Sequence, residues 1–142
     1  MTAEWWDAKP GESAAPPPKK PRRWRDKFGE SFRGVKRGVR GQSSFFVHFF
    51  FAAFALTAAL VLECNHVQWC LIVGCIGLVM TAELFNSAIE TLFHALDRET
   101  KDRMVGCLDI ASGAVLVTSI TAAVVGAIVF GQKVMQLVRV TG

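Results

Sequence analysis

Three long stretches of the chain are almost continuously apolar. Residues 45–62 and 110–131 contain no formal charge, and a third stretch, 68–93, has an apolar first half and a polar second half. A helix needs about 20 apolar residues to cross a hydrocarbon core of roughly 30 Å. The pattern therefore predicts an all-α integral membrane protein with spans near 44–62, 68–93 and 110–135. Because the apolar runs are continuous rather than alternating, they argue against a transmembrane β-barrel.

The segment 22–41, just before the first span, has a helical period of its own. Apolar residues recur there at spacings of three or four, at Trp24, Phe28, Phe32, Val35 and Val39. Basic residues fill most of the other positions: Arg22, Arg23, Arg25, Lys27, Arg33, Lys36, Arg37 and Arg40. This pattern predicts an N-terminal amphipathic surface helix that lies in the membrane interface. It leaves open whether the helix only anchors the chain or also contacts phosphate groups.

Proline and positive charge are concentrated before the spans. All five prolines lie within residues 1–21, so we expect a disordered, basic, proline-rich tail followed by one membrane domain, 22–142. Most of the 16 Lys and Arg residues precede Gly41. The positive-inside rule then places the N-terminus and the connection 94–108 in the cytoplasm, and the short connection 63–66 outside. No nucleic-acid-binding module accompanies this charge, so we expect no nucleic-acid partner.

Two carboxylates and an amide interrupt the second span. Glu83 and Glu90 are seven residues apart, so on a helix they share one face, about 10 Å apart along the axis, with Asn86 beside them. Acids inside a membrane are costly and indicate function by default. The stripe would suit a metal, a proton path or a polar ligand; alternatively, the helix end emerges into water and Glu90 is an ordinary interfacial acid. Asp109, before the third span, is expected to be a helix N-cap.

The string Glu83-x-x-Asn86-Ser87-Ala88-Ile89-Glu90, a polar loop, Asp109 and a third span rich in Gly and Ala follow one another along the chain. In this, the chain resembles the prokaryotic diacylglycerol kinase and undecaprenol kinase family over roughly residues 23–131. The resemblance implies a homotrimer in the bacterial inner (cytoplasmic) membrane with active sites at the interface between subunits. It also implies transfer of the γ-phosphate of MgATP to the hydroxyl of a membrane lipid.

The resemblance also assigns roles to individual residues. Glu83 matches the catalytic carboxylate that takes the proton of the lipid hydroxyl, and Glu90 matches a carboxylate that binds Mg²⁺. The residues that it places at the nucleotide or on the catalytic face are Arg23, Asn86, Glu99, Lys101 and Asp109. Glu99 and Lys101 are expected in a loop that borders the nucleotide. No glycine-rich phosphate loop is present in the sequence, so the ordinary nucleotide-binding motifs are excluded.

Three positions depart from the family pattern. Gln42 stands where a metal-binding glutamate is usual, Leu108 replaces the lysine of a Lys–Asp pair, and His94 replaces an acid. Gln42 still offers a neutral oxygen to a hard cation, so we expect it at the metal. Glu30 could supply a further metal ligand, and Lys101 or Arg98 could stand in for the missing lysine. The departures leave open a catalytically impaired membrane binding or scaffold subunit, and the acids alone would also fit an ion-conducting trimer.

Overall fold

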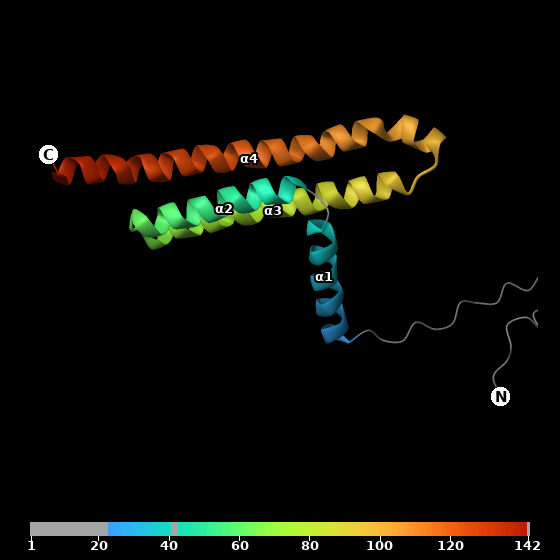
Figure 1. The fold of residues 1–142 in the computed structure, drawn as a ribbon, viewed down its shortest axis with the longest axis horizontal. Helices are drawn as coiled ribbons and strands as arrows, with labels where there is room; N and C mark the ends of the chain where they lie inside the picture. The colour runs from blue at the N-terminus through green and yellow to red at the C-terminus, as the bar shows by residue number, and fades with distance from the viewer. Residues whose placement is uncertain (1–22, 41–42, 142) are drawn as a thin grey trace, which may run out of the picture.

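The computed structural model describes residues 23–40 and 43–141 of the chain. In this part the protein is entirely helical, with α1 (Trp24–Val39), α2 (Ser43–Val61), α3 (His66–His94) and α4 (Arg98–Thr141) (Figure 1). Helices α2, α3 and α4 are long and apolar enough to cross a membrane. The prediction of an all-α membrane protein with an N-terminal helix and three spans is confirmed. The predicted tail, residues 1–21, lies outside the described residues.

The three spanning helices run side by side, and α1 projects sideways from them (Figure 1). Their small buried core consists of Ala59, Ile72 and Val129, one residue from each helix. Most large apolar side chains point outward instead, including Phe46, Phe50, Phe54, Leu78, Phe85, Ile110 and Val117. An apolar surface of this extent is stable only against lipid or other apolar protein surface, which agrees with membrane insertion.

The turn between α2 and α3 is held from both sides. Asn65 and Gln68 form a capping box: the Gln68 N–H donates to Asn65 Oδ1 (3.0 Å), and the Asn65 N–H donates to Gln68 Oε1 (2.9 Å). Lys133 of α4 reaches this turn, where its Nζ donates to the carbonyl oxygen of Glu63 at 2.7 Å. The C-terminal part of α4 therefore lies at the same end of the bundle as the α2–α3 turn.

The connection between α3 and α4 is much shorter than the sequence predicted. The polar segment 94–108 was expected to be a loop, but α4 begins at Arg98, and its helix continues past the predicted end of the third span to Thr141. Asp97, rather than the predicted Asp109, caps this helix. Its carboxylate accepts hydrogen bonds from the Thr100 N–H (3.0 Å) and from the Thr100 hydroxyl (2.8 Å). These bonds hold the pKa of Asp97 below its usual value. The first turns of α4 are exposed on most sides, so they lack the apolar period that marks a helix.

The amphipathic helix α1 leaves its apolar side chains uncovered. Trp24, Phe28 and Phe32 are each more than 70% exposed, and no residue of α1 is buried. Since α1 projects sideways from the spanning helices, it can lie in the plane of a membrane surface with these rings in the lipid (Figure 1). The C-terminal end of α3 and the first turns of α4 extend beyond the level of α1 (Figure 1). This placement separates a membrane part of the bundle from a protruding helical hairpin.

The orientation of the bundle remains a prediction from the positive-inside rule, which places α1 and the α3–α4 connection in the cytoplasm. We expect a membrane-impermeant thiol reagent applied from outside intact cells to label a cysteine introduced at His66 but not one at Asp102. Both positions are exposed. The background for this measurement is a chain whose four native cysteines are replaced by alanine. Labelling only at Asp102 would reverse the assigned topology.

Candidate active site

Glu83 is a buried acid between two spanning helices. Only 2% of the residue is exposed, and with Phe45 it is one of the largest fully buried residues in the described part of the chain. The hydroxyl of Ser44, in the first turn of α2, donates a hydrogen bond to Glu83 Oε1. The ring of His48, one turn further along α2, lies with Nε2 3.9 Å from Glu83 Oε2. Both carboxylate oxygens therefore face polar groups that α2 supplies.

The surface helix is fastened one turn away from this acid. The Ser87 hydroxyl donates to the carbonyl oxygen of Gly38, near the end of α1, at 3.0 Å. A Cβ atom at Gly38 would lie 2.7 Å from Leu84 Cδ2, so glycine allows the backbone of α1 to approach α3 closely. Glu83 consequently lies near the level at which α1 meets the bundle, which is the expected membrane surface.

Asn86 and Glu90 continue the polar stripe away from the membrane part. Asn86 Nδ2 donates to Glu90 Oε1 at 3.0 Å, and both residues are half-buried. Helix α3 is continuous from His66 to His94, so Glu83 and Glu90 share one face as the spacing predicted, about 10 Å apart along the axis. The carboxylate of Glu90 and the amide oxygen of Asn86 are hard donors that suit Mg²⁺. Within the described ranges, no three His, Cys, Asp or Glu side chains gather as a ready metal site.

Asp109 is not the N-cap that the sequence predicted. It lies well inside α4, and it is exposed. The face of α4 that packs into the bundle at this level is marked by Ala111, which is only 6% exposed. At about 100° per residue, Asp109 lies roughly opposite to that face. Within one chain, α4 therefore carries Asp109 away from the acidic stripe.

The other predicted nucleotide contacts are dispersed within the single chain. Arg23 is exposed at the N-terminal end of α1, whereas Gly38 near the other end meets α3. Glu99 and Lys101 lie in the first turn of α4 rather than in a loop, which corrects that prediction. Glu99 accepts from Arg103 at 2.7 Å on the exposed surface, and Lys101 Nζ donates to the carbonyl oxygen of His94 at 3.2 Å. Gln42 lies outside the described residues.

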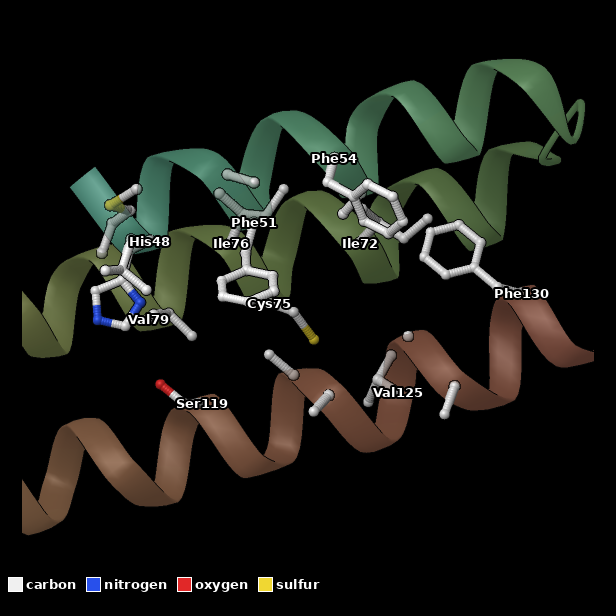
Figure 2. A pocket seen from close by; sticks show the side chains of 18 residues that line it. His48, Phe51, Phe54, Ile72, Cys75, Ile76, Val79, Ser119, Val125 and Phe130 are labelled. Atoms are coloured by element: carbon white, nitrogen blue, oxygen red, sulfur yellow. The ribbon is translucent and has the colours of Figure 1, made fainter. Parts of the chain in front are cut away.

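A groove opens beside the buried acid. It has a volume of about 530 Å³ and lies between α2, α3 and α4, with an almost wholly apolar lining. Figure 2 shows His48 at one end, with Ser119 of α4 across from it, and Phe130 at the other end. His48 therefore approaches Glu83 and also lines this apolar groove.

Comparison with known proteins assigns the chain to a family. A family model described as prokaryotic diacylglycerol kinase matches residues 29–130. The chain belongs to the prokaryotic diacylglycerol kinase family. The matched range contains the acidic stripe and Asp109, whereas Arg23 precedes it. The undecaprenol kinase of Bacillus subtilis (strain 168) is 27% identical over 112 residues, which cover 76% of this chain and 91% of that protein. No solved structure shows significant similarity to the chain.

Membership makes this chain a relative of membrane lipid kinases, and its buried Glu83 lies between helices that are apolar enough to span a membrane. Sequence reasoning found Glu83, Asn86 and Glu90 but missed Ser44, His48 and Ser87 as their neighbours. The sequence of the first span contains a pattern that could have predicted Ser44 and His48 as neighbours of the acid. Ser44 and His48 are four residues apart and therefore lie on one face of a helix that is otherwise apolar there. Likewise, Ser87 follows Glu83 by one helical turn.

Proposed function

We propose that this member of the diacylglycerol kinase family transfers the γ-phosphate of ATP to a membrane lipid alcohol at the cytoplasmic face of a bacterial inner membrane. The observation that carries this proposal is the environment of Glu83. This carboxylate is buried among spanning helices near the level at which α1 meets the bundle, and it accepts a hydrogen bond from an alcohol hydroxyl, that of Ser44. The hydroxyl of a lipid alcohol offers the same kind of donor. Membership of a lipid kinase family supports the same reaction.

In the proposed reaction, Glu83 is the general base. The lipid oxygen attacks the γ-phosphorus, its O–H bond breaks, the proton passes to a carboxylate oxygen of Glu83, and ADP leaves. Phosphoryl transfer asks little covalent chemistry of the protein, since positioning and charge neutralisation supply most of the catalysis. A base held by fixed partners at the membrane surface meets the first requirement, because lipid headgroups are confined to that level.

The second requirement is neutralisation of the charge on the phosphates, and we assign it to a Mg²⁺ ion held by Glu90 and its neighbours. Mg²⁺ in kinases is usually held by one or two carboxylates together with the substrate phosphates, so Glu90, with Asn86 beside it, fits this ion. Mg²⁺ bound there would neutralise charge on the phosphates of ATP. Gln42 is proposed as a further oxygen ligand.

The nucleotide contacts are proposed to come from more than one chain. Asp109 lies opposite to the face of α4 that packs into the bundle, so in a single chain it does not join Glu83 and Glu90. This placement supports a homotrimer whose active sites lie between subunits. In that assembly we assign Arg23, Glu99 and Lys101, together with Asp109, to the nucleotide.

An assay of the purified protein in mixed micelles tests this function. The protein is supplied with Mg²⁺, labelled ATP, and either diacylglycerol or undecaprenol, and phosphorylated lipid is measured. We expect phosphate transfer to one of the two alcohols, and the name of the Bacillus relative favours undecaprenol. Nucleotide binding without phosphorylated lipid would favour the alternative of a binding or scaffold subunit and would overturn the proposed reaction.

A gain-of-function variant tests the proposed metal ligand at position 42. Gln42→Glu adds an anionic oxygen, which a hard cation prefers to a neutral one. We expect the Mg²⁺ concentration for half-maximal rate to fall roughly threefold or more, because each added carboxylate strengthens metal binding. The measurement is a full Mg²⁺ titration of lipid phosphorylation. Gln68→Glu does not serve as a control, because the Gln68 side chain is part of the capping box of α3. Gln132→Glu, on exposed surface of α4, is the matched control. An unchanged titration would remove position 42 from the metal site.

A further inference from the structure

Two side chains of α2, those of Ser44 and His48, lie against the carboxylate of Glu83 and take no part in the proposed proton transfer. Ser44 and His48 lie one helical turn apart, and each approaches a different oxygen of the carboxylate. The side chain of Glu83 is only 3% exposed, whereas that of His48, which lines the groove, is 18% exposed. Water therefore has little access to the carboxylate itself.

The burial of Glu83 bears on whether its carboxylate can carry a negative charge. An ionised carboxylate removed from water is strongly destabilised unless a partner of opposite charge lies nearby. The Ser44 hydroxyl supplies a hydrogen bond but no charge. Among the residues that the structure describes, His48 is the only basic group within 4.0 Å of Glu83. Helix α4, on the other side of the groove, has no charged residue between Asp109 and Lys133.

We propose that His48 is a positioning residue for Glu83: as an imidazolium, it keeps the carboxylate ionised inside the bundle and orients it, while Ser44 fixes the other oxygen. A base must be ionised to accept a proton, and a cation beside a buried carboxylate favours its ionised form. The inference rests on the proposed function where it treats Glu83 as the base. The pairing of the two charges is a property of the chain that can be measured without any reaction.

Chemical labelling of Glu83 tests the pairing. Dicyclohexylcarbodiimide modifies carboxyl groups in apolar surroundings only when they are protonated, and peptide mass spectrometry locates the modified residue. At pH 7, without ATP or lipid substrate, we expect little modification of Glu83 in the wild type. His48→Gln keeps a polar side chain but removes the cation, so modification should rise roughly tenfold. Equal modification of Glu83 in both proteins would overturn the proposal.

Two further variants separate charge from shape. His66→Gln makes the same substitution at an exposed position in the α2–α3 turn region, at the start of α3, and should leave Glu83 unmodified. His48→Lys restores a cation on a flexible stem, and the neighbouring groove has room for it. We expect this variant to return modification of Glu83 toward the wild-type level. If lysine and glutamine at position 48 give the same high modification, the role of charge is refuted.

A measurement on the wild type does not depend on whether the variants fold. The chain has three histidines, so ¹⁵N labelling of histidine gives few signals, and the spectra of the two exposed residues serve as references. We expect both ring nitrogens of His48 to carry protons at pH 7. A neutral His48 ring would overturn the proposal.

Turnover then separates this inference from the proposed function. In His48→Gln we expect kcat for lipid phosphorylation to fall roughly a hundredfold while the KM for lipid stays nearly unchanged, because the base is lost but the lipid site is not. If the wild type phosphorylates no lipid alcohol, the proposed function fails, and the labelling and NMR results still decide the role of His48. If the wild type is active but a neutral His48 is found, the inference fails and the function stands.

Discussion

Replacing Glu83 with glutamine is expected to lower kcat for lipid phosphorylation roughly a thousandfold, the usual contribution of a general base. Glutamine has nearly the same volume, and its amide oxygen can still accept the hydrogen bond that Ser44 donates to Glu83. The buried site should therefore keep its packing and lose only the group that takes the proton. The measurement is the initial rate of phosphate transfer in mixed micelles at saturating MgATP and lipid.

The control for this variant is Glu63→Gln, the same change in the α2–α3 turn at the other end of the bundle. The Glu63 side chain is exposed, and the hydrogen bonds of this residue come from its backbone, whose carbonyl oxygen accepts from Lys133 and whose N–H donates to the carbonyl oxygen of Leu60. Glu63→Gln should keep the wild-type rate. Both variants should elute at the wild-type size in detergent. Wild-type turnover by Glu83→Gln would exclude Glu83 as the base.

Replacing Glu90 with glutamine is expected to raise the Mg²⁺ concentration for half-maximal rate roughly tenfold or more, since a hard cation loses an anionic ligand. The variant should regain part of its rate at high Mg²⁺, in contrast to Glu83→Gln, which no metal concentration should rescue. Titration of the rate with Mg²⁺ at fixed ATP distinguishes the two cases. A normal Mg²⁺ dependence in Glu90→Gln would show that the carboxylate is an ordinary interfacial acid, the alternative that the sequence left open.

Several features of the fold followed from local pattern alone. A continuous apolar run of sufficient length has few stable structures other than a spanning helix, and the spans were predicted to within a few residues for α2 (Ser43–Val61) and α3 (His66–His94). The helical period of the apolar residues in 22–41 predicted α1 (Trp24–Val39) in the same way, because these residues recur on one face. The prediction failed at the start of α4. The segment after Arg98 is exposed on most sides, so its helix rests on the Asp97 cap and pairs such as Glu99–Arg103 rather than on a buried face.

The sequence by itself determined which residues of α3 share a face, because helical geometry relates Glu83, Asn86 and Glu90 without reference to any other element. Only the tertiary structure decided what surrounds them. Ser44 is 39 residues from Glu83 along the chain, and Ser87 is 49 residues from Gly38. Contacts of this kind depend on the rotation and axial position of one helix against another. Side-chain packing between helices sets both, and no local period encodes them. The same rotation turned Asp109 away from the face of α4 that packs into the bundle, although its position in the sequence had placed it at the same end of the bundle.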